Sequence, residues 1–225
     1  MEERTATIER RSKGLFIVLE GGEGVGKTTQ AKMLVERLWQ EGHDALLTKQ
    51  PGGSEGICRR IRELLLDRSY LGTFSPVAEL LLYLADKAQH IQEVIVPALE
   101  KGKIVVCDRY IGVTFSYQHY VRQVCSREEF DFLLSFATGH LQPDYTYWFD
   151  LDPEVGLRRN SKIEEQQTRF EDEGLHFHTR AREGFHDFFS NYCHPEKWRK
   201  IDASRSVDEL HAELADHIIA LISAR

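Results

Sequence analysis

The chain has 225 residues, a length that suits one domain with a large buried core. Hydrophobic residues make up 41% and charged residues 29%, proportions typical of a soluble globular protein. The formal net charge of −7 argues against a dedicated nucleic-acid-binding protein, because such proteins present a basic surface. No segment approaches the roughly 18 consecutive apolar residues of a membrane-spanning helix, so we expect neither a nucleic-acid nor a membrane partner.

The cysteines and the N-terminal residues indicate the compartment. The four cysteines are widely spaced and form no Cys-x-x-Cys pair, which argues against a zinc site or a disulfide framework. Reduced thiols are expected, and they indicate a cytoplasmic protein. Residues 1–13 are polar and acidic, unlike a signal peptide or a transit peptide. We therefore expect a mobile tail over 1–13 and a single domain over 14–225.

Short apolar segments alternate with amphipathic segments along the chain. The apolar segments predict strands at 15–19, 45–48, 104–107, 145–151 and, more weakly, 200–202. Apolar residues at three- and four-residue spacing predict helices, including a long one over 75–101 with Val77 and Leu81 in its buried stripe. Apolar residues from Val207 to Leu221 mark a final helix. Apolar strands separated by helices indicate a parallel α/β sheet covered on both faces.

Residues 21–28 match the phosphate-binding motif G-x-x-x-x-G-K-[ST], after the first strand and before a helix. Backbone N–H groups of such a loop surround phosphates, and Lys27 reaches the outer ones. The Thr28 hydroxyl is placed to bind Mg²⁺, and the helix adds its positive N-terminal end. A merely flexible glycine-rich turn would not explain the Lys-Thr pair. The predicted triphosphate site comprises Gly21, Gly22, Glu23, Gly24, Val25, Gly26, Lys27, Thr28 and Thr29.

Asp108 and Arg109 directly follow the strand predicted at 104–107. In open α/β sheets, ligands bind beyond the carboxyl ends of the strands. The Asp108 carboxylate can hold Mg²⁺ directly or through water, and the guanidinium of Arg109 suits a phosphate. A structural ion pair at the end of the strand is the alternative, and the nearby phosphate loop makes a ligand site the better explanation.

Two further pairs are less specific. Tyr83 and Lys87 share one helix face, where a ring and a cation could bind a nucleobase. A boundary aromatic residue beside a solvated lysine explains that spacing as well. Tyr117 could limit a sugar pocket and Gln118 could pair with a base edge, although ordinary packing explains both residue types.

The polar segment 158–173 has the composition of an exposed, movable segment. It contains Arg158, Arg159, Lys162 and Arg169 among several glutamates and glutamines. Phosphoryl transfer requires positioning and neutralisation of charge rather than covalent chemistry by the protein. The phosphate-loop lysine, Mg²⁺ and these basic residues can supply that neutralisation.

With these motifs in place, the chain resembles the bacterial thymidylate kinases from residue 14 onward. The matching segments are 16–30, 48–53, 79–83, 88–90, 97–99, 108–110, 117–118, 169–171 and 201–203. The resemblance implies a P-loop kinase fold, with three layers, a central parallel five-stranded sheet flanked by helices, and a short lid. It also implies transfer of the ATP γ-phosphate to dTMP with Mg²⁺ as cofactor, giving dTDP, in a homodimer.

The same resemblance implies roles for individual residues. Glu23 would lie near the deoxyribose 3′-OH, and Tyr117 would crowd a ribose 2′-OH. Tyr83 would stack on thymine, with base-edge contacts nearby. The implied substrate contacts are Glu23, Tyr83, Lys87, Arg109, Thr114, Tyr117 and Gln118. The implied catalytic residues are Lys27, Asp108, Arg109, Arg159 and Arg169, and the metal-binding residues are Thr28 and Asp108.

Gly24 stands where some members of the family carry an arginine, so the chain resembles the subtype with catalytic arginines in the lid. Here the lid would be about 158–173, with Lys162 and Ile163 at positions where further arginines are common. The other departures from the family pattern are Lys49, Gln50, Lys87 and Val113.

Two alternatives to a dTMP kinase stay open. The departures at Lys87 and Val113 fit a related kinase with a shifted acceptor preference. A nucleotide-dependent switch or a catalytically weak nucleotide-binding protein is the other alternative. The guanine-binding pattern Asn-Lys-x-Asp, usual in GTP-dependent switches, is absent from the sequence.

Overall fold

The computed structural model describes residues 14–161 and 168–224. The predicted mobile tail, 1–13, lies outside the described residues, as does part of the predicted lid, 162–167, which includes Lys162 and Ile163. The predictions for these segments therefore stay predictions.

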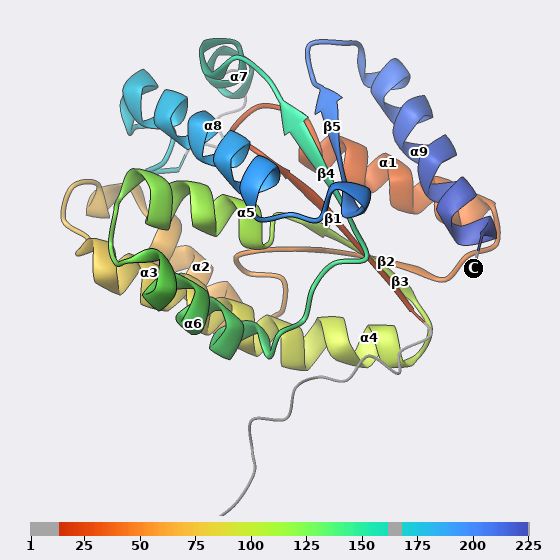
Figure 1. The fold of residues 1–225 in the computed structure, drawn as a ribbon, viewed down its shortest axis with the longest axis horizontal. Coiled ribbons are helices and arrows are strands. Elements are labelled where there is room, and N and C mark those ends of the chain that lie inside the picture. The colour runs from red at the N-terminus through yellow and green to blue at the C-terminus, as the bar shows by residue number, and fades with distance from the viewer. Residues whose placement is uncertain (1–13, 162–167, 225) are drawn as a thin grey trace, which may run out of the picture.

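Five strands form one parallel sheet in the order β2-β3-β1-β4-β5 (Figure 1). The strands are β1 (Leu15–Gly21), β2 (Ala45–Lys49), β3 (Ile104–Asp108), β4 (Tyr145–Asp150) and β5 (Trp198–Asp202). Leu19 of β1 pairs with Asp108 on one side and with Tyr147 on the other. Since all strands run in one direction, their carboxyl ends meet at one edge of the sheet, and the predicted parallel five-stranded sheet is confirmed.

Helices connect the strands and cover the sheet. They are α1 (Lys27–Gln40), α2 (Ile57–Leu66), α3 (Pro76–His90), α4 (Val96–Glu100), α5 (Ile111–Thr114), α6 (Arg127–Thr138), α7 (Pro153–Asn160), α8 (Gly174–Asn191) and α9 (Val207–Ser223). The long helix predicted over 75–101 consists of α3, a π-helical turn over Ile91–Ile95, and α4. In the described part of the chain, no helix is long and apolar enough to cross a membrane.

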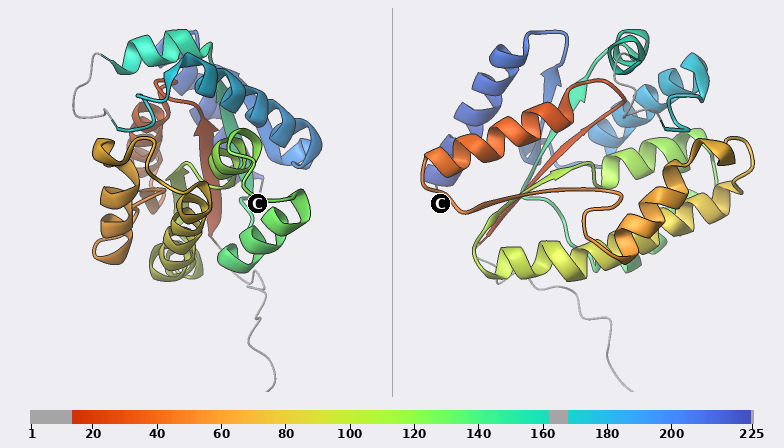
Figure 2. Two further views of the ribbon diagram at one scale, coloured as in Figure 1. Left: turned by 90° about the vertical axis from the view of Figure 1, so that its left-hand side faces the viewer. Right: turned by 180° about the vertical axis from the view of Figure 1, so that it is seen from behind.

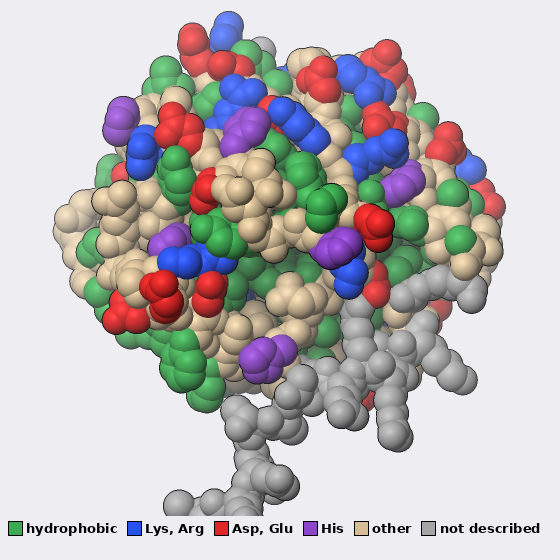
Figure 3. Space-filling view, viewed as in Figure 1, with side chains coloured by type: hydrophobic (Ala, Val, Ile, Leu, Met, Phe, Trp, Pro, Cys, Tyr) green, Lys and Arg blue, Asp and Glu red, His purple; other side chains and the backbone are tan. Residues whose placement is uncertain are grey.

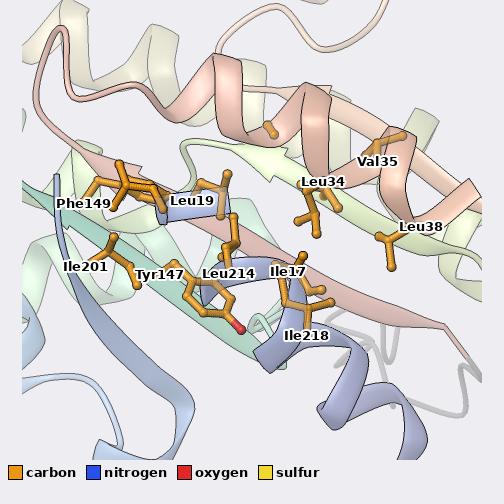
Figure 4. Close-up of a cluster of buried hydrophobic side chains, with 14 of the residues drawn as sticks. Ile17, Leu19, Leu34, Val35, Leu38, Tyr147, Phe149, Ile201, Leu214 and Ile218 are labelled. Atoms are coloured by element: carbon orange, nitrogen blue, oxygen red, sulfur yellow. The ribbon is translucent and has the colours of Figure 1, made fainter. Parts of the chain in front are cut away.

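The side chains of β1 alternate between two cores, as a strand that is buried on both faces requires. Leu15, Ile17 and Leu19 face α1 and α9 (Figure 4), whereas Phe16 and Val18 face the core that includes α3 and α4. Seen from behind, α1 lies in front of the sheet, with α9 beside it (right panel of Figure 2). The result is the expected three-layer arrangement.

The predicted buried stripe of the long helix is wrong at two positions. Val77 and Leu81 of α3 are 51% and 49% exposed. The buried face of α3 instead includes the polar residues Glu79 and Lys87. Apolar spacing did not predict that Glu79 and Lys87 are buried. Their charged groups have polar partners inside the protein, which the spacing of apolar residues does not reveal.

The phosphate loop between β1 and α1 packs against α7, backbone to backbone. A Cβ atom on Gly24 would lie 1.9 Å from the carbonyl oxygen of Gly156, and Gly24 has a φ of +66°. A Cβ atom on Gly156 would lie 2.3 Å from the carbonyl oxygen of Glu23. The Asp152 carboxylate accepts N–H groups of Glu154 and Val155 and so fixes the start of α7. A side chain at position 24 would therefore displace either the loop or α7.

We expect Gly156→Ala to lower the free energy of unfolding by about 1–3 kcal/mol, because the added methyl group overpacks against the Glu23 carbonyl. This loss should appear although alanine favours a helix over glycine by about 1 kcal/mol. Urea denaturation followed by circular dichroism measures the change.

Glu154→Ala is the control in the same helix. Glu154 is exposed and lies 3.8 Å from Arg158, so its loss should change the stability by less than about 0.5 kcal/mol. If Gly156→Ala were as stable as the wild-type protein, α7 would not be held in place by this contact.

Candidate active site

A cavity of about 480 Å³ opens at the carboxyl ends of the strands, a size that suits small-molecule ligands. The phosphate loop contributes one wall, and the segments after β2 and β3 contribute the opposite wall. Side chains that line the cavity include Lys27, Thr28, Lys49, Gln50, Arg62, Tyr83, Asp108, Arg109, Val113, Tyr117, Gln118, Arg159, Phe170 and Glu171. Many of the residues predicted from separate motifs are thus brought together around one space.

Most of the predicted phosphate loop borders the cavity, whereas Gly21 and Gly22 do not line it. Gly26, with a φ of 93°, precedes α1, and residues 23–29 line the cavity. The Lys27 ammonium donates to the carbonyl oxygen of Gly22 at 2.5 Å and is buried. Burial and repulsion from Arg109 lower the pKa of Lys27 to about 8. Attraction to Asp108 and Glu23 raises the pKa and offsets part of this decrease. An anion beside this ammonium would restore the lost stabilisation of its charge.

Two side-chain oxygen groups of a kind that can bind a cation lie side by side in the site. The Thr28 hydroxyl donates to Asp108 Oδ2 at 2.5 Å, across the gap between α1 and β3. Asp108 Oδ1 is buried and has no hydrogen-bond partner in the described part of the chain. Mg²⁺ prefers such oxygen ligands and completes its shell with water and substrate phosphates. Within residues 14–161 and 168–224, no cluster of three or more His, Cys, Asp or Glu side chains forms a metal site by itself.

Arg109 turns back over β1 because its φ is +72°, an uncommon conformation for a residue with a side chain. Its guanidinium donates to the carbonyl oxygen of Gly21 at 3.1 Å and to Glu23 Oε2 at 2.7 Å. Burial opposes the charge of Arg109, but Glu23 and the other nearby acidic groups raise its pKa above the ordinary value. The site therefore contains a fixed cation beside the phosphate loop.

Glu23 connects this cation with the far wall of the cavity. Burial opposes its ionised form, but Arg109 and Lys27 lower its pKa below the ordinary value. The Tyr117 hydroxyl donates to Glu23 Oε1 at 3.2 Å, and burial and the Glu23 charge raise the pKa of Tyr117 well above its usual range. Behind Glu23, a second cavity of about 20 Å³ borders His178 and Arg182, with room for about one water molecule.

Three aromatic rings contribute to the lining of the cavity. Tyr83, Tyr117 and Phe170 lie there, with the Phe170 ring 6.3 Å from that of Tyr83 and 5.6 Å from that of Tyr117. The Gln118 amide lies beside them and donates to Glu79 at 2.7 Å. Rings with one amide offer a flat heterocycle stacking surfaces and a hydrogen bond at its edge.

Two of the predicted substrate contacts do not line the cavity. Lys87 is buried and donates to Gln50 Oε1 at 2.9 Å and to the Tyr110 carbonyl, and burial lowers its pKa to about 8. Thr114 is also buried, and its hydroxyl donates to the same carbonyl oxygen at 3.4 Å. The alternative of a solvated lysine beside a boundary aromatic residue is wrong, because Tyr83 and Lys87 are both buried.

The expectation that all of 158–173 is exposed is wrong at Asn160, Arg169 and Phe170, which are buried. Arg169 Nε donates to the Leu65 carbonyl oxygen at 2.5 Å, and its NH2 group lies 2.7 Å from Glu79 Oε2. Its guanidinium is therefore placed in the core, outside the lining of the cavity, and would have to leave Glu79 to reach a phosphate.

The two arginines of α7 differ in position, which the sequence could not establish. Arg159 lines the cavity and donates to the Ala203 carbonyl oxygen at 2.9 Å. Arg158 is exposed, does not line the cavity, and lies 3.8 Å from Glu154.

Sequence reasoning missed two residues that shape the site. Glu20 accepts N–H groups of Tyr110, Gly112 and Val113 and so fixes the start of α5. Its position as the one acidic residue in an apolar strand was a usable signal. Arg62 lines the cavity from α2 and donates to the Pro51 carbonyl oxygen at 2.8 Å. Nothing in the local pattern around Arg62 distinguishes it from the other arginines of this helix.

Comparisons with known proteins agree with this geometry. The Thymidylate kinase family model matches residues 19–214. A thymidylate kinase of Synechococcus sp. (strain JA-2-3B'a(2-13)) is 48% identical over 200 residues, which cover 89% of this chain and 92% of that protein. That of Bacillus licheniformis is 42% identical over 196 residues, covering 87% and 90% respectively, and that of Clostridium novyi is 38% identical over 204, covering 90% and 97%. The chain therefore belongs to the thymidylate kinase family.

Proposed function

We propose that the protein is a dTMP kinase, which transfers the γ-phosphate of ATP to dTMP and gives dTDP and ADP. The observation that carries this proposal is that one cavity joins the phosphate loop to a cation-bearing pocket lined with aromatic rings. Membership of the thymidylate kinase family supports the choice of acceptor.

The donor nucleotide would bind at the N-terminus of α1. The Lys27 ammonium would give up its hydrogen bond to the Gly22 carbonyl oxygen and bind the outer phosphates. The backbone N–H groups of the loop would bind the inner phosphates. Thr28 and Asp108 would hold Mg²⁺, which supplies charge neutralisation between the phosphates when it is bound.

The acceptor would lie across the cavity. Arg109 would bind its phosphate, and the positive charge of Arg62 would attract the same phosphate. Tyr83 would stack on the base, while Glu23 and Tyr117 would face the sugar. The second pKa of a phosphate monoester is near 6, so the attacking oxygen is mostly ionised at neutral pH. The residues therefore need to position and shield charge rather than to remove a proton.

The surface offers support for a homodimer, which we also propose. Val77 and Leu81 are exposed on α3, and Phe132 and Phe136 are 69% and 71% exposed on α6, which packs against α3. Hydrophobic side chains gather at the lower left of the molecule, over these helices (Figure 3). A second copy of the chain would cover this apolar face, as an isologous interface does.

We also place the enzyme in the cytoplasm. All four cysteines are free thiols, and Cys58 and Cys107 are buried. Thiols of this kind persist in a reducing compartment, where disulfides are rare.

The acceptor preference is tested with the purified full-length protein, ATP, Mg²⁺ and each of dTMP, dUMP, dCMP and UMP. We expect dTMP to give the highest kcat/KM, and chelation of Mg²⁺ to abolish the turnover of all four. Lys27→Ala controls for a contaminating kinase and should be inactive but folded, because it removes the ammonium that binds the phosphates.

A higher kcat/KM for another acceptor than for dTMP would instead establish a related kinase with a shifted acceptor preference. The position of Val113 in the cavity lining is the observation that favours this second candidate. Tight GTP binding without turnover of any monophosphate would establish a nucleotide-dependent switch.

We expect Arg159→Ala to lower kcat on the order of 10²-fold with little change in the KM for dTMP, because its charge would act on the transferred phosphate. Steady-state kinetics with both substrates varied separates the two constants. Arg158→Ala is the matched control, since it removes the neighbouring guanidinium that lies outside the cavity, and its kcat should change less than twofold. Equal losses in the two variants would contradict a specific role for Arg159.

The homodimer is tested by light scattering after size-exclusion chromatography. The wild-type protein should elute with twice the mass of the chain, and Phe136→Glu should elute as a monomer, because a charge would be buried in the interface. Leu175→Glu places the same charge at an exposed position of α8 and should stay dimeric. A monomeric wild-type protein would refute the proposed interface.

A further inference from the structure

Glu79 is a buried carboxylate with three polar neighbours from distant parts of the chain. It lies on α3, and its side chain is 1% exposed. Oε1 accepts a hydrogen bond from Gln118 Nε2 at 2.7 Å and lies 3.6 Å from Arg122 Nε, while Oε2 lies 2.7 Å from Arg169 NH2. A buried charge is tolerated only when such groups compensate it.

The charge of Glu79 determines which end of the Gln118 amide faces it. An ionised carboxylate accepts hydrogen bonds and cannot donate, so the NH₂ group of the amide must point to Glu79. Across residues 14–161 and 168–224, the Gln118 side chain makes no second hydrogen bond, and it lines the cavity. The amide oxygen is therefore the group that Gln118 offers to a ligand.

We propose that Glu79 is a positioning residue that turns the Gln118 oxygen toward the cavity and thereby selects acceptors whose base edge donates a hydrogen bond. Thymine and uracil carry an N–H group at ring position 3, whereas cytosine carries an unprotonated nitrogen there. An acceptor oxygen facing this nitrogen repels it, and the desolvated pair stays unsatisfied. This inference rests on the proposed kinase function and specifies how that site would reject dCMP.

A carboxylate at position 79 is needed for this selection, because an amide there would not impose one orientation. A glutamine at position 79 could accept from Gln118 or donate to it, so both orientations of the Gln118 amide would become possible. The reversed orientation presents NH₂ to the cavity, which suits cytosine and opposes thymine.

The test compares Glu79→Gln with the wild-type enzyme for dTMP and dCMP. We expect the ratio of kcat/KM for dTMP to that for dCMP to fall about tenfold, with an unchanged KM for ATP. Arg122→Gln is the matched control, because it removes another neighbour of the same carboxylate and leaves the contact with Gln118 in place. Its thermal stability should fall, while its ratio of dTMP to dCMP should match that of the wild-type enzyme.

Glu79→Gln leaves the Arg169 guanidinium without its counter-charge, so a second variant, Glu79→Gln with Arg169→Met, removes both charges of the pair. It should show the same reduced discrimination. An unchanged ratio in the folded variants, with stability alone affected, would overturn the positioning role. If the wild-type enzyme did not phosphorylate dTMP at all, the proposed function would fail, and that result is distinguishable from an unchanged ratio.

Discussion

The carboxylate of Glu20 accepts three backbone N–H groups at the point where β1 passes the turn after β3. Without this carboxylate, three buried N–H groups would lose their partner, at a cost of about 1–3 kcal/mol each, which is large relative to the marginal stability of a domain. Burial raises the pKa of Glu20, and Lys87 together with the N–H groups of Tyr110 and Gly112 offsets part of that rise. The start of α5, and with it the wall that carries Tyr117 and Gln118, depends on this one buried charge.

Lys87 completes the arrangement from the opposite side. Its ammonium donates to the Tyr110 carbonyl, one peptide away from the N–H group that Glu20 accepts. Glu20 thus binds the backbone N–H group of Tyr110, and Lys87 binds its carbonyl oxygen. Lys87 therefore has a structural role, because it fixes the segment that leads into α5.

The sequence predicted the fold well because the signals were local. The strands are short apolar runs, and the phosphate loop is a contiguous motif with the conformation that its glycines permit. Most of the cavity walls followed, since residues after parallel strands must share one edge of the sheet. The direction in which each long polar side chain points could not be predicted in the same way. The sequence does not distinguish Arg159 from Arg169, but Glu79 and the Leu65 carbonyl oxygen, both far away in the chain, hold Arg169 in the interior.

The contact between Gly24 and Gly156 constrains how this chain can change over evolutionary time. A Cβ atom on Gly24 would overlap the Gly156 carbonyl oxygen, so a side chain cannot enter the loop while α7 stays in place. A loop arginine and a closely packed α7 are mutually exclusive, so a lineage must exchange one arrangement for the other by coordinated substitutions. The uncharged contact between the backbones of Gly24 and Gly156 thus limits where a cation can be placed near the transferred phosphate.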